Sequence, residues 1–303
     1  MAAMFAVPAA AAPLTYVLVP EPVAEGIWLI RGADDDIRAS NGGAIANITV
    51  IATDAGAVLV DAGPSLRYGR QLAEVAAKLV GKPVTRVYLT HLHPDHTYGD
   101  AAFDPAAIAA TPALIASLKA EGGGFADGMY RLLGDWMRGT ELRFPGHVVS
   151  APAETVGGRT FRMLPLAGHS AADLVLLDTR TGTLVAGDLV FHNRAPSTPH
   201  GDLPRWRTSL DTLKALGHAR VIPGHGPLDA TPGTAIDQTR GWIDWLDGAL
   251  GDAAAKGLDM VEAGAMPIPS RFAAVKEARY ELQRSVAHLY PAFEARWPRV
   301  DGR

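Results

Sequence analysis

Three histidines and an aspartate lie within six consecutive positions in the segment HLHPDH, which starts at His91. In an extended loop, His91 and His93 project to the same side because side chains alternate with a period of two. Pro94 then turns the chain, so that Asp95 and His96 can face a neighbouring point. Imidazole nitrogen and carboxylate oxygen are ligands that zinc binds readily. The segment therefore predicts a metal site with room for two adjacent ions.

The rest of the composition limits what such a site can be. None of the 303 residues is cysteine, which excludes disulfides, thiolate nucleophiles and metal centres with cysteine ligands. The formal net charge of −4 provides no basic field for nucleic acid or an anionic membrane surface. We therefore expect a small-molecule substrate and no nucleic acid. The absence of cysteine fits the periplasm and the cytoplasm equally.

Short buried strands must position the histidine segment. Between residues 26 and 61, the apolar runs GIWLI, AIANITVIA and AVLVDAG are divided by Gly, Asn and Asp, which predicts a strand meander. Ser65 can cap a helix over LRYGRQLAEVAAKLV, which Gly81 and Pro83 then end. VTRVYLT follows as a buried strand, so the histidine segment is expected at the carboxyl end of that strand.

The second half of the chain repeats this order of elements. A helical insertion is expected at about residues 111–140, with EGGG as a flexible hinge, and strand patterns return in HVVSAPAETVGG, TFRMLPLAG, DLVLLDTRTG and TLVAGDLVF. RWRTSLDTLKAL predicts a helix, RVIPGHG predicts a strand ending in a histidine loop, and helices are expected from about residue 233. We therefore predict a pseudo-duplicated αββα sandwich, with two unrelated domains as the alternative.

The N-terminal residues differ in character from the rest. Residues 1–22 are predicted to be a flexible tail or the remnant of a signal peptide, and residues 23–303 to be a single domain. AVPAAAAPL resembles the end of a signal peptide, but no basic region precedes it, and Pro8 and Pro13 interrupt the apolar run. No membrane span is expected here.

The HLHPDH segment resembles the HxHxDH signature of the metallo-β-lactamase superfamily. The resemblance continues from about residue 24 to residue 228, because LAGHS, VAGDLVF and IPGHG follow in the family's order, each at a strand end. It implies the αββα metallo-β-lactamase sandwich and a dinuclear metal site. By this resemblance, His91, His93 and His169 would hold a first ion, Asp95, His96 and His225 a second, and Asp188 would bridge them.

The resemblance also implies roles for two aspartates. VLVDAGPSLRYG matches the family's strand that ends in Asp-x-Gly, and Asp61 is expected to orient the histidine loop by hydrogen bonds. The alternative for Asp61 is an Asx turn. Two zinc ions, with iron or manganese as alternatives, would lower the pKa of bound water to roughly 7. Asp95 would then act in catalysis by orienting the hydroxide and passing a proton to the leaving group.

Several segments are similar to one branch of the superfamily. SNGGAIANITVI, DAGPSLRYG, THLHPDHTYGDAAF and AGDLVFHNRAP, together with RWRTSLDTLKAL, look like the quinoprotein relay system zinc metallohydrolases. This likeness implies association with a quinoprotein dehydrogenase system and favours the periplasm, with the cytoplasm as the alternative. The absence of cysteine argues against the lactamase subgroup that uses cysteine as a ligand.

Loops around the strand ends are the expected source of substrate contacts. His192, Arg194 and Trp206 follow Asp188 and could bind a carboxylate or stack on a flat group. The alternative is a solvated basic loop that packs one tryptophan. Tyr98 is a candidate oxyanion donor, with packing in the core or at the rim as the alternative.

These observations predict a dinuclear zinc metallohydrolase. It would cleave an ester, thioester, lactone or amide bond, including a β-lactam, by metal-bound hydroxide. One alternative is a mononuclear iron oxidoreductase of the persulfide dioxygenase type. Another is a non-catalytic metal-binding partner of a quinoprotein dehydrogenase. A complete ligand set with room for a bridging water favours catalysis, because structural zinc sites are usually closed.

Overall fold

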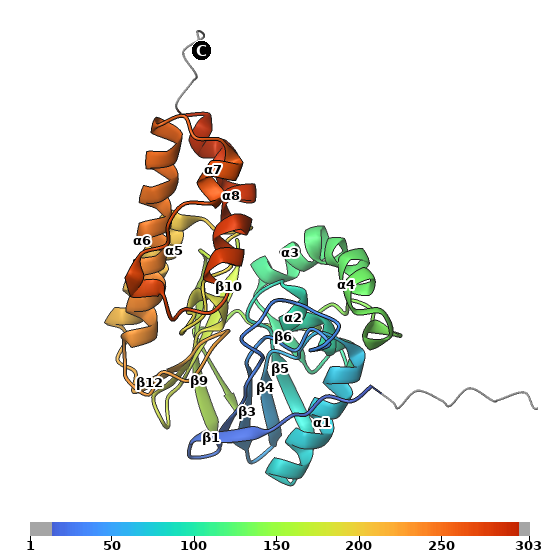
Figure 1. Ribbon diagram of the computed structural model, residues 1–303. Helices are drawn as coiled ribbons and strands as arrows, with labels where there is room; N and C mark the ends of the chain where they lie inside the picture. Colours follow the sequence, from blue (N-terminus) through green and yellow to red (C-terminus); the bar gives the residue numbers. More distant parts are fainter. Residues whose placement is uncertain (1–13, 297–303) are drawn as a thin grey trace, which may run out of the picture.

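Two β-sheets form the centre of the computed structural model, which describes residues 14–296, and helices flank them (Figure 1). The first sheet has the order β1-β2-β3-β4-β5-β6-β7, with β1 Pro20–Ala24, β2 Ile27–Ile30, β3 Ile48–Thr53, β4 Gly56–Val60, β5 Val84–Tyr88, β6 Ile108–Ala110 and β7 His147–Val148. The second has the order β12-β11-β10-β9-β8, with β8 Ala153–Val156, β9 Arg159–Leu166, β10 Asp173–Asp178, β11 Thr183–Val185 and β12 Arg220–Ile222. The two sheets thus follow one another along the chain, as the predicted sandwich requires.

The helices connect the strands and extend the chain beyond them. In the first half these are α1 Leu66–Val80, α2 Pro94–Thr97, η1 Tyr98–Ala102, α3 Pro112–Glu121, η2 Gly122–Phe125, α4 Ala126–Leu133 and η3 Gly134–Met137. In the second half they are η4 Gly187–Leu189, α5 Leu203–Ala215, α6 Thr234–Ala255, α7 Met260–Gly264, η5 Ser270–Phe272 and α8 Ala278–Glu294. The elements α3 to η3 lie within residues 111–140, and α6 begins at Thr234.

Strand direction brings several strand ends to one edge. The meander β1 to β4 is antiparallel, whereas the four strands β4 to β7 run parallel to one another. In the second sheet β11 and β12 are also parallel. Parallel strands end at the same edge of a sheet, so residues that follow them come close together. Asp61 follows β4, His91 follows β5, Asp188 follows β11 and His225 follows β12.

The central strands are buried because both faces of each sheet are covered. All five residues of β4 and all six residues of β10 are buried, which explains their continuous apolar runs. Between the sheets, Val58, Val60 and Leu29 belong to the same core cluster as Phe161 and Leu176. This cluster joins the two halves behind the site.

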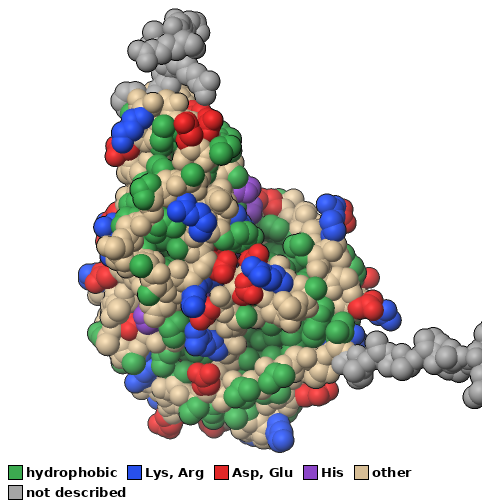
Figure 2. Space-filling model, viewed as in Figure 1, with side chains coloured by type: hydrophobic (Ala, Val, Ile, Leu, Met, Phe, Trp, Pro, Cys, Tyr) green, Lys and Arg blue, Asp and Glu red, His purple; other side chains and the backbone are tan. Residues whose placement is uncertain are grey.

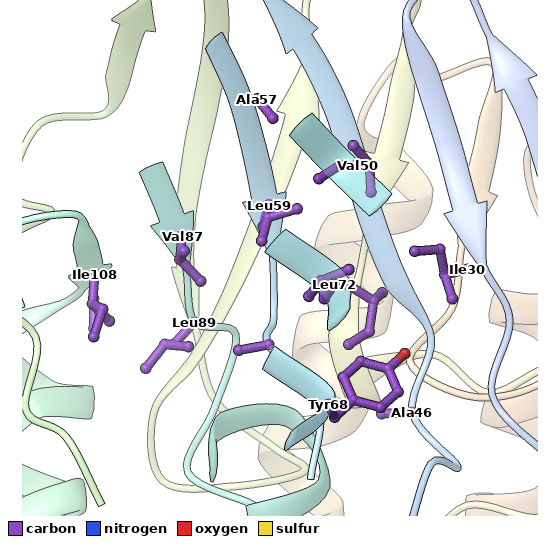
Figure 3. Packing of buried hydrophobic residues seen from close by; sticks show 14 of the residues in the cluster. Ile30, Ala46, Val50, Ala57, Leu59, Tyr68, Leu72, Val87, Leu89 and Ile108 are labelled. Carbon is purple, nitrogen blue, oxygen red and sulfur yellow. The ribbon is translucent and has the colours of Figure 1, made fainter. Parts of the chain in front are cut away.

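Helix α1 covers the outer face of the first sheet and abuts the loop that follows the histidines. The Ser65 side chain accepts a hydrogen bond from Tyr68 N (3.2 Å), and Gly81 ends the helix in the left-handed conformation. Tyr68 and Leu72 pack against sheet residues such as Leu59 (Figure 3). A Cβ at Gly69 would lie 2.0 Å from Gly99 O, so only glycine permits this close approach of α1 to η1.

Residues 14–22, which the predicted boundary assigns to the tail, contact the domain. Tyr16 is buried, and its hydroxyl lies 2.8 Å from Gly42 O and 3.0 Å from Ser65 Oγ. Residues 14–22 therefore pack on the domain, and β1 begins within them. Residues 1–13 of the predicted tail lie outside the described residues.

None of the helices within residues 14–296 combines the length and the apolar character needed to cross a membrane.

Candidate metal centre

The HLHPDH segment follows β5 and turns directly into the short helix α2. His93 has an extended backbone and stands immediately before Pro94, whose fixed φ suits the first position of a helix. This turn places Asp95 and His96 on a different side from His91 and His93. Ala62 N donates to His96 O (2.8 Å), which ties the turn to the end of β4.

Three imidazole nitrogens from this segment and from the second sheet meet at one point. His93 Nδ1 lies 3.0 Å from His91 Nε2 and 2.8 Å from His169 Nε2. Asp188 Oδ2 lies 3.3 Å from His169 Nε2 and 3.8 Å from His91 Nε2. The donor atoms of these four residues all lie within 4.8 Å of one another, which is a spacing that one metal ion can bridge.

A second group of donors lies next to the first. His96 Nε2 and His225 Nε2 are 3.4 Å apart, and Asp95 Oδ2 lies 3.6 Å from His96 Nε2 and 3.4 Å from His225 Nε2. Asp188 also reaches this group, because its Oδ1 is 3.1 Å from His96 Nε2 and its Oδ2 is 3.3 Å from His225 Nε2. The carboxylate of Asp188 therefore lies between the two groups.

Each of the five histidines has its other ring nitrogen held by a partner. His91 Nδ1 lies 2.9 Å from Thr90 Oγ1, His96 Nδ1 is 2.7 Å from Asp61 Oδ2, and His93 Nε2 is 2.9 Å from His200 Nδ1. His169 Nδ1 donates to Ser197 O (3.1 Å), and His225 Nδ1 donates to Ile45 O (2.9 Å). Such partners fix the ring orientation and the tautomer, leaving the inward nitrogen as the ligand atom.

Asp61 connects the ends of the two parallel strands β4 and β5. Its Oδ1 accepts a hydrogen bond from Thr90 N (2.8 Å), and its Oδ2 lies 2.8 Å from Thr90 Oγ1 and 2.7 Å from His96 Nδ1. Its φ of 65° is in the left-handed region, which is uncommon for a residue other than glycine. The backbone strain is thus located at the residue that orients the histidine turn, and Asp61 is in neither group of converging donors.

Electrostatics favours neutral imidazoles in the first group. Burial lowers the pKa of His91 and His93 well below their usual range, and lowers the pKa of His169 to about 4. Burial acts in the same direction on His96, but the carboxylates of Asp188, Asp95 and Asp61 outweigh it and hold the pKa of His96 well above its usual range. For Asp188, burial opposes ionisation, but the neighbouring histidines hold its pKa well below the usual range.

The donor set fits divalent metal ions. His91 Nε2 and His169 Nε2 lie 3.0 Å and 2.8 Å from His93 Nδ1. Burial lowers the pKa of all three rings, and a neutral imidazole has a lone pair available for a metal ion. Asp188 Oδ1 is buried and has no hydrogen-bond partner among the described residues, although His96 Nε2 lies 3.1 Å away. Buried polar atoms are rarely left unpaired, so a cation is the expected partner of this oxygen. Imidazole and carboxylate donors are typical of zinc.

The family follows from a comparison that covers all of these donors. The family model described as the metallo-β-lactamase superfamily matches residues 41–225. The chain belongs to the metallo-β-lactamase superfamily.

Two curated relatives within the superfamily illustrate the range of similarity. The Beta-lactamase-like protein 2 homolog of Caenorhabditis elegans is 27% identical over 71% of this chain and 66% of its own length. The chain thus spans just under two thirds of that relative. The Metallo-beta-lactamase type 2 of Bacillus cereus is 29% identical over 60% of this chain and 67% of its own length.

Solved structures share the superfamily fold at lower identity. The metallo-β-lactamase from Pontibacter korlensis has a TM-score of 0.61 at 18% identity, over 75% of this chain and 99% of that one. The sec-alkylsulfatase Pisa1 from Pseudomonas sp. has a TM-score of 0.66 at 19% identity, over 91% of this chain and 50% of that one. These likenesses concern the fold, and they confirm the predicted mixed α/β sandwich.

The superfamily metal centre opens into a pocket of about 400 Å³. The lining includes the donors His93, Asp95, Asp188 and His225 and the insertion residues Gly124, Phe125, Gly128, Met129 and Leu132. Further lining comes from the 194–200 loop and from α8. Figure 2 shows histidine at the surface in the notch between the C-terminal helices and the α3–α4 segment. Because His93, Asp95, Asp188 and His225 line the pocket, a small molecule in it can reach these donors.

The four expected substrate contacts have different positions. Arg194 lines the pocket, but it is only 3% exposed, and its Nη1 donates to Glu281 Oε1 (3.0 Å). Trp206 is fully buried beneath His169, with Nε1 donating to Leu189 O (2.9 Å), and Tyr98 is buried with its hydroxyl donating to Gly122 O (2.8 Å). Their burial argues against direct contact of Trp206 and Tyr98 with substrate.

The fourth, His192, is partly exposed beside the centre. Its Nδ1 lies 2.9 Å from Pro227 O, and it is outside the described lining of the pocket. The ring therefore supports the turn that carries His225.

Other residues near the centre have no strong signal in the sequence. His200 lies in STPHGD, and Asp173 begins β10, where its Oδ2 accepts hydrogen bonds from His169 N and Ser170 N (both 3.1 Å). Arg284 reaches the pocket from α8, nearly 60 positions after the last donor. A single histidine or arginine in these segments shows no pattern of spacing that could reveal its position.

Proposed function

We propose that the protein is a dinuclear zinc metallohydrolase that cleaves an ester, thioester, lactone or amide bond, including a β-lactam. The observation that carries this proposal is the pair of adjacent donor groups that share Asp188 and border an open pocket. Catalytic zinc sites keep a position open to water and substrate, whereas structural sites are closed.

The proposal assigns each donor a place. His91, His93 and His169 would hold one ion, Asp95, His96 and His225 the other, and Asp188 would contact both. When bound, two such ions supply Lewis acidity and make a water molecule nucleophilic near neutral pH. Zinc is the favoured metal because all the donors are imidazole or carboxylate, and iron and manganese are the alternatives.

The chain's own groups handle the proton and exclude competing water. Asp95 lines the pocket and is 6% exposed, so its carboxylate can orient the attacking water and transfer a proton to the leaving group. Phe125 packs its ring edge against both His93 and His200, with centroids 5.8 Å apart in each case. This apolar contact limits water access from the side of the insertion.

We further propose that the protein belongs with the quinoprotein relay system zinc metallohydrolases, is exported to the periplasm and works with a quinoprotein dehydrogenase system. The quoted motifs, from SNGGAIANITVI to RWRTSLDTLKAL, support this proposal. Fractionation of native cells, followed by immunodetection, tests the location; recovery in the cytoplasmic fraction alone would contradict it.

A substrate panel with metal analysis of the same sample tests the proposed activity. The panel holds lactones, thioesters, β-lactams and phosphodiesters, and the names of the structural relatives add a secondary alkyl sulfate. We expect two zinc ions per chain and turnover of at least one acyl substrate. A single iron with oxygen consumption on a persulfide would instead identify a dioxygenase. Full metal loading without any turnover would favour a non-catalytic partner.

A further inference from the structure

Arg284 presents unused hydrogen-bond donors to the pocket. This arginine lies on α8, lines the pocket and has 37% of its side chain exposed. Its Nη1 donates to Ser197 Oγ (3.1 Å) and to both carboxylate oxygens of Glu281 (3.2 Å each). Among residues 14–296, no hydrogen-bond acceptor is found for Nε or Nη2. These two donors form one edge of the guanidinium, which matches two coplanar oxygens of a ligand.

Short connections place this edge beside the first donor group. Ser197 accepts from Arg284 through its side chain, and it accepts from the donor His169 through its backbone oxygen (3.1 Å). Three residues later, His200 is hydrogen-bonded to His93 (2.9 Å). Ser197 therefore contacts both the guanidinium of Arg284 and a histidine of the metal centre. A small molecule with two functional groups can reach both.

The pocket wall around Arg284 carries charges of both signs. Glu281 is fully buried and shared by two cations, because Arg194 Nη1 lies 3.0 Å from the same Oε1 that Arg284 contacts. Of the two guanidinium groups that share Glu281, Arg284 is the exposed one. Asp36 also lines the pocket, and it shares Arg38 with Asp35. Because Glu281 contacts only Nη1 of Arg284, an anion can bind the other edge of this guanidinium.

The rest of the pocket is suited to an apolar group. Ile37, Phe125, Met129 and Leu132 line the side formed by the insertion and the 31–47 loop. A molecule with one charged end and one apolar part would fit a pocket with this division.

We propose that the substrate carries a carboxylate, which Arg284 binds through Nε and Nη2 while the scissile bond lies at the metal centre. This proposal rests on the proposed hydrolase function and names its substrate class. Arg284 is then a specificity-determining residue supplied by the C-terminal helices, outside the 41–225 segment that defines the family.

A matched pair of aryl esters tests the proposal. The metal-loaded protein is assayed on mono-p-nitrophenyl glutarate, which has a free carboxylate, and on its methyl ester, which does not. Arg284→Gln should lower kcat/KM for the charged ester by roughly 10- to 100-fold, as expected for loss of a charged hydrogen bond. Its effect on the neutral ester should be less than about threefold, and Arg284→Lys should restore part of the loss. Arg205→Gln is the matched control, because Arg205 is exposed on α5 and paired with Asp202.

Equal losses on both esters, or no loss on either, would overturn the proposal. Circular dichroism and metal content of each variant establish that the fold and the centre are intact. Binding gives a readout that does not depend on turnover: calorimetric titration with glutarate should show affinity that Arg284→Gln weakens by a similar factor, with little binding of dimethyl glutarate. Unchanged glutarate affinity in the variant would assign the carboxylate to the metals alone and reject the site. Arg284-dependent binding without turnover of either ester would reject the hydrolase function and keep the carboxylate site.

Discussion

The two halves of the chain supply the metal centre in different ways. The first half contributes His91, His93, Asp95 and His96 from one turn of backbone after β5. The second half contributes its three donors one at a time, after β9, β11 and β12. The first group is organised locally, whereas the geometry of the second depends on the register of a whole sheet and on its packing against the first.

Direct hydrogen bonds hold the two halves in register at the centre. Asn47 Nδ2 donates to Pro223 O (2.9 Å) and Gly226 O (2.8 Å), which bracket His225 in the second half. Leu174 N of β10 donates to Thr90 O (2.7 Å), next to His91. Hydrogen bonds from the Asn47 side chain and from the backbone of β10 thus hold the dispersed donors beside the local turn.

The largest expected effect comes from the donor that serves both groups. Asp188→Ala should reduce zinc to well below one ion per chain, whereas His93→Ala should retain about one ion, because Asp95, His96 and His225 remain with Asp188. Loss of activity should exceed the roughly 100-fold that the loss of an outer hydrogen-bond partner causes. Mass spectrometric metal analysis after dialysis measures the number of zinc ions per chain. Asp211→Ala, at an exposed aspartate paired with Arg240, is the control.

The fold should survive both changes, since the core cluster between the sheets does not include these side chains. If circular dichroism shows either variant unfolded at room temperature, the metals are structural. Equal metal content in the two variants would contradict the central position of Asp188.

A backbone change in the second half should disturb the centre without altering any donor. A Cβ at Gly224 would lie 1.9 Å from Asp188 Oδ1, so Gly224→Ala must displace that carboxylate. We expect a decrease of roughly 10- to 100-fold in metal affinity, comparable with the loss of a supporting contact. Gly217→Ala is the control, because a Cβ there meets no atom within 4 Å. Competition with a chromophoric chelator measures the affinity, and an unchanged value for Gly224→Ala would show that Asp188 can move freely.

The contrast between the halves explains what could be predicted from the sequence. The HLHPDH turn is readable because its donors are neighbours in the chain, and α1 was predictable to the residue because Ser65 and Gly81 mark its ends. His169, Asp188 and His225 became visible only through family resemblance, since their proximity depends on sheet packing. The family resemblance includes the strands and the metal donors of both halves. The predicted strands and donors therefore lie in both sheets.

The outer contacts could not be predicted for the same reason. Trp206 was predicted to stack on a substrate because it follows Asp188 in the chain, yet its ring is buried against His169. Arg284 and His200 belong to segments whose position over the centre depends on how α8 and the 194–200 loop pack. No local pattern encodes such a position, so these residues emerge only from the structure.

Asp61 in the first half and His200 in the second half each hydrogen-bond to a metal-binding histidine, and their loss should lower zinc affinity by different amounts. Asp61→Asn keeps the shape and tolerates the positive φ, but it removes the charge that holds His96, and we expect metal affinity to decrease by about 10- to 100-fold. His200→Ala should cost about tenfold or less, because His200 is exposed and water can replace it beside His93. Calorimetric titration with zinc measures the zinc affinity of each variant. A larger effect for His200 than for Asp61 would place the main support of the turn in the second half.

The smallest expected effect concerns Asp100, on the 3-10 turn that extends the histidine turn. Asp100 is fully buried, and neither of its carboxyl oxygens is hydrogen-bonded to a described residue. Burial raises its pKa well above the ordinary 3.8 and outweighs the backbone N–H and the charge of Arg143, which act in the opposite direction. Above pH 3.8 the folded chain therefore retains a proton that the unfolded chain has lost. Stability must then decrease as pH rises from about 4 through the folded pKa.

Asp100→Asn removes this titration, so the free energy of unfolding should decrease less between pH 5 and pH 8 in the variant than in the wild type. Urea unfolding at pH 5 and pH 8 measures this free energy. The protein is first freed of metal with a chelator, because metal binding itself depends on pH. Asp104→Asn, at an exposed position nearby, should behave like the wild type. An identical pH dependence in Asp100→Asn would mean that the buried carboxyl is ionised and has a partner. The local turn would then be held by a charge interaction in addition to the hydrogen bonds of Asp61.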